Sequence, residues 1–128
     1  MIRKTRQRTA IREALEAGGR PMSPEEVLAA AQQQVRGLGI ATVYRNLKAL
    51  VEEGWLTPVE LPGQPARYEL AGKDHHHHFH CRACGRVFEL HGCVGRLAGL
   101  APDGFETTGH DLLLYGNCAE CRARKDAP

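Results

Sequence analysis

The spacing of the cysteines constrains this chain more than any other feature of its sequence. Four of the five cysteines form two CxxC pairs, Cys81/Cys84 and Cys118/Cys121. One CxxC pair directs two thiolates at a single metal ion, and two such pairs complete the closed tetrahedral ligand set of a structural zinc. Because the two pairs are far apart in the sequence, intervening structure must bring them together. We therefore predict a small domain clamped by one Zn²⁺.

Disulfides and buried thiols are the alternative interpretation of these cysteines. The N-terminal residues are basic, and no apolar segment of the kind found in a secretory signal follows them, which predicts a cytoplasmic protein. In that reducing compartment such cysteines bind metal rather than pair with one another. No run of apolar residues approaches the length of a transmembrane helix, so we expect no membrane partner.

The histidines and cysteines are confined to one half of the chain. All seven histidines and all five cysteines lie from His75 onward, and residues 1–72 contain neither type. Imidazoles and thiolates are the ligands that borderline-soft metals prefer. We therefore expect an α+β chain with two domains: a scaffold over residues 1–72 and a metal-binding domain over residues 73–128.

Apolar spacing and capping signals predict three helices in the first domain. The first follows a basic arm and ends at Gly18-Gly19. The second begins with Ser23 as N-cap, closes a capping box with Glu26 and runs to about Gln34. The third ends before Gly54. Its predicted core stripe is Val43, Leu47, Leu50 and Val51.

Two strands, at residues 55–61 and 67–70, flank a Pro62-Gly63 turn after the third helix. Three helices with a two-stranded wing form a winged helix-turn-helix, whose third helix enters the major groove of double-stranded DNA. Residues 1–12 carry five basic side chains and no acid, which is typical of an arm that contacts phosphate or the minor groove. The alternative for the three helices is a generic helical core, and the alternative for the arm is a solvated helix face. The net charge of +2 is too small to indicate a nucleic-acid partner by itself.

Five segments together resemble the ferric uptake regulator (Fur) superfamily of bacterial metal-dependent repressors. They are residues 5–8 (TRQR), 40–47 (IATVYRNL), 75–78 (HHHH), 81–85 (CRACG) and 114–121 (LYGNCAEC). The resemblance covers nearly the whole chain. It implies an N-terminal winged helix, a small C-terminal α/β dimerisation domain with a four-cysteine structural zinc at Cys81, Cys84, Cys118 and Cys121, and a homodimer that binds an AT-rich inverted repeat.

The resemblance also implies particular contacts with DNA. Tyr44 and Arg45 match the contacts of the family's recognition helix, and Arg3 or a neighbour matches its minor-groove contact. Together with the polar face of the third helix and the basic arm, the predicted DNA-binding residues are Arg3, Arg6, Arg8, Thr42, Tyr44, Arg45 and Lys48.

A first sensing site follows from the resemblance, with one departure. The family uses alternate residues of the histidine run, a carboxylate on the following helix and a histidine on the last strand, and these positions fall on His75, His77, Arg96 and His110. A guanidinium cannot bind metal, but Cys93 lies one helical turn earlier on the same face. We therefore predict a site of His75, His77, Cys93 and His110. The alternative is that Cys93 is a small buried side chain in a short helix.

A second sensing site in the family bridges the two domains. The matching residues here are Glu69, His76, His78 and Glu89. Its usual ligand from the second helix is missing, because that position aligns with Pro21 or Met22. The alternative for Glu69 is an exposed strand carboxylate. His80 and His91 receive no role and are expected at the surface.

Imidazoles and a thiolate favour zinc as the sensed ion, which places the chain closest in character to zinc-uptake repressors. Fe²⁺ or Mn²⁺ sensing, or peroxide sensing, is the alternative within the superfamily. An enzyme is not expected, because the His-x-Glu and Pro-Cys-x-x-Cys signature of zinc deaminases is missing. The alternative of another class is a metal-storage or chaperone module, which explains the histidine run but does not explain the winged helix.

Overall fold

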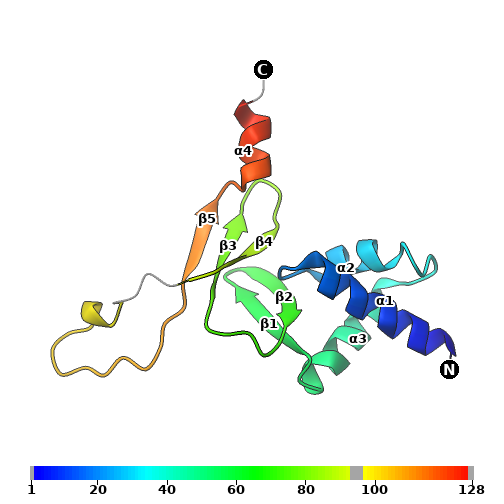
Figure 1. Ribbon diagram of the computed structural model, residues 1–128, viewed down its shortest axis with the longest axis horizontal. Helices are drawn as coiled ribbons and strands as arrows, with labels where there is room; N and C mark the ends of the chain where they lie inside the picture. Colours follow the sequence, from blue (N-terminus) through cyan, green and yellow to red (C-terminus); the bar gives the residue numbers. More distant parts are fainter. Residues whose placement is uncertain (1, 93–96, 127–128) are drawn as a thin grey trace. The chain divides into compact units, whose positions relative to one another are not determined.

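The chain forms two compact units, residues 1–73 and residues 74–128 (Figure 1). The computed structural model describes residues 2–92 and 97–126, and the side chains of residues 4–92 and 97–125. Three helices come first along the chain, and two small sheets and a last helix follow them, so the predicted α+β class is confirmed. Among the described residues, no helix has the length and apolarity needed to cross a membrane.

Three helices build the first unit, and local sequence explains where they begin and end. They are α1 (Ile2–Gly18), α2 (Pro24–Ala31) and α3 (Ile40–Glu52). The predicted capping box of α2 is present: the Ser23 hydroxyl accepts from the N–H of Glu26, and the Glu26 carboxylate accepts from the N–H of Ser23. Two donors that would otherwise lack a helical partner are thereby satisfied. Gly54, at φ +80°, follows the C-cap of α3 as predicted.

Two helix boundaries differ from the prediction. The basic arm is itself helical, because α1 already begins at Ile2. Residues 2–17 contain neither glycine nor proline, so nothing in that stretch stops the helix from extending through the arm. At the other boundary, α2 ends at Ala31 rather than near Gln34. The N–H groups of Gln33 and Gln34 bond to carbonyls three residues back, which is the tighter geometry of a 3₁₀ turn.

The core of this unit lies where the three helices meet. Ile11 of α1, Val27 of α2 and Val43, Leu47 and Leu50 of α3 are fully buried there. The predicted stripe of α3 is therefore its buried face, with Val51 at the margin of the core. Burying this face leaves the polar side of α3 turned to solvent, as an amphipathic helix requires.

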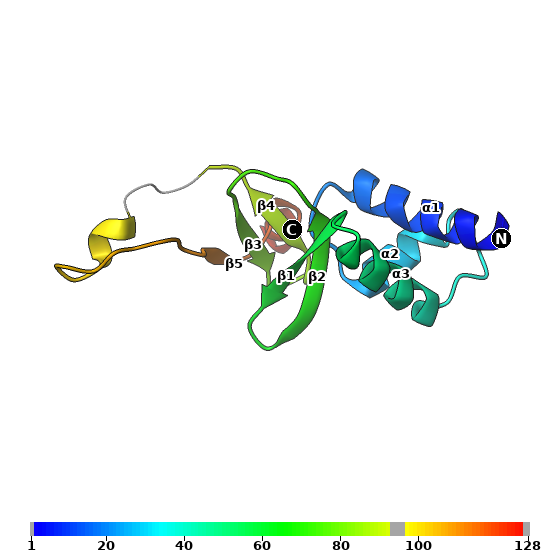
Figure 2. The ribbon, with the colours of Figure 1, turned by 90° about the horizontal axis from the view of Figure 1, so that it is seen from below.

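A β-hairpin completes the winged helix-turn-helix. Strands β1 (Leu56–Leu61) and β2 (Gln64–Leu70) pair antiparallel around the predicted Pro62-Gly63 turn. The second strand starts three residues before the predicted Arg67, because pairing with β1 extends to Gln64. Met22 and Tyr68 exchange backbone hydrogen bonds of 2.9 Å in both directions. This bridge attaches the wing beside the helices (Figure 2).

The second unit contains a three-stranded sheet with the order β4-β3-β5. Its elements are β3 (His77–Cys81), β4 (Val87–Leu90), the 3₁₀ helix η1 (Leu97–Leu100), β5 (Leu113–Gly116) and α4 (Ala119–Asp126). Strand β3 is central, antiparallel to β4 and parallel to β5. A parallel neighbour requires a long connection, and the loop from η1 to β5 supplies part of it (Figure 1).

The central position of β3 corrects one prediction. His80 was expected at the surface, but it is buried with an exposed fraction of 6%. It lies opposite Val87 on β4 and Tyr115 on β5, and neighbours on both sides cover it. His91 is exposed, as expected.

Candidate metal centres and DNA-binding helix

Strand pairing brings the two CxxC pairs together. Cys81 ends β3 and pairs in register with Gly116 of β5, and the N–H of Arg82 donates to the carbonyl of Gly116 at 2.8 Å. The chain after β5 therefore returns Cys118 and Cys121 to the first pair. This is the intervening structure that the long sequence separation required.

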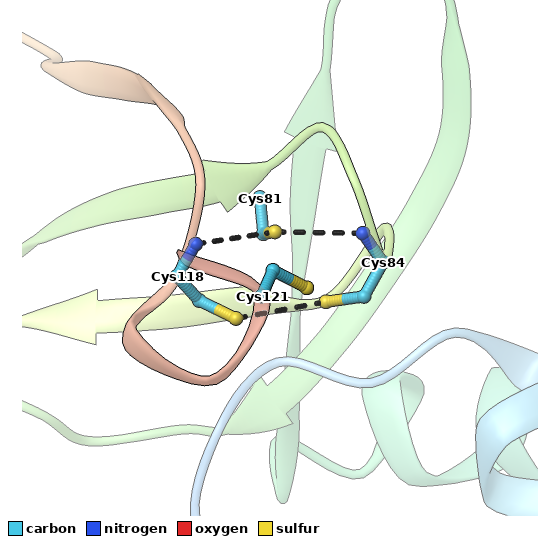
Figure 3. A group of neighbouring side chains, drawn as sticks. All are labelled: Cys81, Cys84, Cys118 and Cys121. Carbon is cyan, nitrogen blue, oxygen red and sulfur yellow. Dashed lines mark hydrogen bonds between the residues drawn. The ribbon is translucent and has the colours of Figure 1, made fainter. Parts of the chain in front are cut away.

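The four sulfurs point at a common centre (Figure 3). All four Sγ atoms lie within 4.8 Å of one another, and the Sγ atoms of Cys84 and Cys118 are 3.9 Å apart. A tetrahedral zinc with Zn–S bonds of about 2.3 Å separates its sulfurs by about 3.8 Å. The spacing is therefore that of ligands around one ion, and it is far longer than the S–S bond of a disulfide, about 2.05 Å.

The pKa values of these thiols indicate that four thiolates need a cation between them. Backbone N–H groups of Cys84 and Cys118 donate to Cys81 Sγ at 3.4 and 3.3 Å, and they lower the pKa of the Cys81 thiol to about 6. Burial, together with the neighbouring cysteines, raises the pKa of Cys121 to about 12. Four thiolates cannot accumulate here without a positive ion, and a divalent metal supplies that charge.

Three histidines converge at a second point of this unit. His110 Nε2 lies 3.3 Å from His75 Nε2 and 3.2 Å from His77 Nε2. Nitrogen ligands about 2.05 Å from a tetrahedral zinc are separated by about 3.3 Å. His110 lies in the loop before β5 rather than on the strand itself, and this loop carries it back to β3.

The electrostatics of this cluster suit a metal. His77 is buried while His75 is exposed. Burial, reinforced by the imidazoles of His75 and His110, lowers the pKa of His77 and favours its neutral form. Neutral imidazole is the form that binds metal. Cys93, the predicted fourth ligand, lies outside the described residues, as does Arg96.

The second predicted sensing set draws on both units. Glu69 belongs to the first unit, where its carboxylate lies 4.0 Å from the ammonium of Lys73. In the second unit, the rings of His76 and His78 are 4.8 Å apart, and Glu89 is the cross-strand neighbour of His78. His76 Nδ1 lies 2.8 Å from the carbonyl oxygen of Asp74, which makes Nδ1 the protonated nitrogen and leaves a lone pair on Nε2. Assembly of the whole set remains a prediction.

Some of the predicted DNA-contacting side chains are exposed, and others bond to groups within the protein. On α3, Tyr44 has an exposed fraction of 46%, and Arg45 and Lys48 are exposed too. Thr42 is half-buried, and its hydroxyl accepts from Arg45 Nη2 at 3.0 Å.

On α1, Arg6 is exposed, whereas the guanidinium of Arg8 pairs with Glu53 at 2.5 Å. That ion pair links α1 to the end of α3 and engages Arg8 within the protein. The side chain of Arg3 lies outside the described set.

Arg86 is a site residue that the sequence reasoning did not select. Its side chain contacts the sulfurs of Cys84 and Cys118 and the carboxylate of Glu120. A basic residue just after a CxxC pair carries no spacing signal of its own. The contact depends on where α4 is placed.

Comparisons with known proteins agree on one family. A sequence model described as the ferric uptake regulator family matches residues 1–115. The ferric uptake regulation protein of Campylobacter jejuni is 34% identical over 129 residues, covering 97% of this chain and 82% of that protein.

Two solved structures extend the comparison to the fold. The ferric uptake regulator of Helicobacter pylori, reported with three functional metal-binding sites, shares 28% identity with a TM-score of 0.68, covering 91% of this chain and 79% of that one. A zinc-bound manganese uptake regulator shares 26% identity with a TM-score of 0.75, covering 88% and 87%. The chain belongs to the ferric uptake regulator family, and it has the winged-helix and dimerisation-domain architecture of that family.

Proposed function

We propose that this metal-responsive regulator is a repressor that senses zinc. As a homodimer in the cytoplasm, it binds an AT-rich inverted-repeat operator in double-stranded DNA when its sensing site is loaded. The observation that carries the proposal is the convergence of three imidazole Nε2 atoms at 3.2 and 3.3 Å, the separations expected around one tetrahedral ion. Members of the family are transcriptional regulators rather than enzymes.

The two metal centres have different tasks in this proposal. Cys81, Cys84, Cys118 and Cys121 hold a zinc with four protein ligands, the closed set of a structural site. This ion keeps α4 attached to the sheet whatever the zinc supply. His75, His77 and His110, with Cys93 as fourth ligand, form the site that fills and empties.

Loading the sensing site changes the protein through the loop that carries His110. Metal joins this loop to β3 and restricts the conformations of the chain leading to β5. Among the arrangements that the dimer samples, metal then favours the one whose two α3 helices match successive major grooves. A second site of Glu69, His76, His78 and Glu89 would couple metal to the wing as well.

The donor atoms support zinc over the alternatives. Imidazole and thiolate ligands suit Zn²⁺, whereas Mn²⁺ and Fe²⁺ accept sets richer in oxygen. Glu89 beside His78 favours the second candidate, an iron- or manganese-sensing or peroxide-sensing regulator, because a carboxylate adds a hard donor. A storage or chaperone module is disfavoured by the winged helix.

Protein that keeps its cysteine-bound zinc but has an empty sensing site tests the choice of ion. Fluorescence anisotropy would follow its binding to a labelled pool of AT-rich inverted-repeat duplexes at buffered free concentrations of Zn²⁺, Fe²⁺ and Mn²⁺. We expect Zn²⁺ to restore binding at the lowest free concentration in the wild type and in His91→Ala, a control at an exposed histidine. If only Fe²⁺ or Mn²⁺ restored DNA binding, the iron-, manganese- or peroxide-sensing regulator would be the better assignment. DNA binding that did not depend on metal would refute metal sensing.

A further inference from the structure

The guanidinium of Arg86 lies against both halves of the four-cysteine centre. Its Nε donates to Cys84 Sγ at 3.2 Å, and its Nη2 lies 3.7 Å from Cys118 Sγ. One of these sulfurs belongs to the first CxxC pair and the other to the second. A single side chain therefore spans the two pairs that the metal must join.

The same side chain is held in place from the opposite side. Arg86 Nη2 lies 2.7 Å from Glu120 Oε2, and Glu120 also pairs with Arg124 one turn along α4. The Arg86 side chain is only 30% exposed. Its geometry is thus fixed by α4 as well as by β4, where the chain continues at Val87.

Charge explains what such a residue does at this position. Four thiolates and one Zn²⁺ carry a net charge of −2, which is costly to hold in a partly buried site. A guanidinium donates several N–H groups in a rigid fork and keeps its charge at all physiological pH values, so it offsets part of this excess while bonding two sulfurs at once. Partners of this kind around a metal typically change affinity roughly 10- to 100-fold.

We propose that Arg86 is a positioning residue of the four-cysteine centre, which retains the metal ion through hydrogen bonds to the sulfurs of Cys84 and Cys118. This inference rests on the proposed structural zinc. It adds a fifth protein side chain to a site of four ligands, and it assigns that side chain an electrostatic effect on the thiolates. Anchoring of α4 alone is the competing explanation.

The test uses full-length protein loaded with one equivalent of Co²⁺, which should occupy the four-cysteine centre first. An ion with four thiolate ligands absorbs by thiolate charge transfer more strongly than an ion with Cys93 as its single thiolate ligand. Arg86→Met removes both the charge and the N–H donors. Arg86→Lys keeps the positive charge but lacks the planar guanidinium that can donate to two sulfurs at once. Arg82→Met is the matched control, because Arg82 lies between the two cysteines of the first CxxC pair and has its guanidinium over the Tyr115 ring. Glu120→Gln removes the negative charge of the ion pair to α4 but keeps an oxygen that accepts from Arg86, so it should retain both sulfur contacts.

We expect Arg86→Met to bind Co²⁺ and Zn²⁺ roughly 10- to 100-fold more weakly in competition with EDTA. Its charge-transfer band should move to lower energy, because hydrogen-bond donors stabilise the sulfur electrons that the transition moves. Arg86→Lys should lie between Arg86→Met and wild type. Arg82→Met and Glu120→Gln should keep the wild-type band and nearly the wild-type affinity.

Two results would overturn the inference while leaving the structural zinc intact. One is wild-type affinity and an unshifted band in Arg86→Met, and the other is equal loss in Arg82→Met or Glu120→Gln. A wild-type protein without the thiolate band would instead refute the four-cysteine centre itself, and the Arg86 inference with it. The wild-type sample therefore separates the two failures.

Discussion

Replacing His110 with alanine removes the imidazole that joins the loop before β5 to strand β3. The Nε2 atom of His110 lies 3.3 Å from Nε2 of His75 and 3.2 Å from Nε2 of His77. Without it, two imidazoles from the same short segment remain, and they cannot link the loop to the strand. The variant should therefore lose sensing while its four-cysteine centre stays filled.

The magnitude follows from the ligand count. Apparent binding free energies of roughly 10–16 kcal/mol for zinc held by four protein ligands amount to about 2.5–4 kcal/mol for each ligand. Loss of one imidazole should then weaken zinc binding at this site by roughly two to three powers of ten.

Competition with a chromophoric zinc chelator, after one zinc per chain has been bound by the cysteines, measures this affinity. His91→Ala provides the control, because it removes an exposed histidine from the same unit. A His110→Ala protein whose second zinc binds within about threefold of wild type would refute the three-histidine site, since that change is under 1 kcal/mol.

Three further outcomes follow from individual contacts. The pKa of His77 is lowered in the folded protein, so the unfolded chain binds more protons as pH falls below about 6.5, and protein with an empty sensing site should lose stability in that range. Urea unfolding at pH 7.5 and pH 5.5 should show a larger loss for wild type than for His77→Gln, and an equal loss would contradict this origin. Ser23→Ala should lower the free energy of unfolding by about 0.5–2 kcal/mol in urea titrations, because the N–H of Glu26 loses its acceptor, and an unchanged midpoint would exclude the cap. Arg45→Ala should weaken operator binding by about 1–3 kcal/mol in anisotropy titrations, and unchanged affinity would remove Arg45 from the interface.

Local signals predicted the first unit well, because its elements begin and end through contacts between near neighbours. The box of Ser23 with Glu26 spans three residues, and Gly54 ends α3 through its own backbone conformation. The start of α1 was not predicted correctly, since no residue in the basic arm stops a helix and the arm was assigned a separate role. A local pattern predicts the end of a helix only where a residue with special backbone or capping chemistry marks it.

Features that depend on contacts between distant segments were harder to predict from the sequence. The burial of His80 depends on β5 pairing parallel to β3, and no local pattern reports that partner. The convergence of the four cysteines was predicted because CxxC spacing implies a shared ion. The contacts of Arg86 could not be predicted, because they depend on where α4 lies. The grouping of His75, His77 and His110 came from the family resemblance, and the structure brings these three side chains together.

The most direct test of zinc sensing is a titration of operator affinity against bound zinc. Metal-free protein receives increasing equivalents of Zn²⁺, and both zinc content and DNA affinity are measured at each step. The four-cysteine centre should fill first without creating operator binding, and affinity should rise as the second equivalent enters the histidine site. Full DNA affinity with the first equivalent alone, or affinity that does not depend on the second, would contradict sensing by His75, His77 and His110.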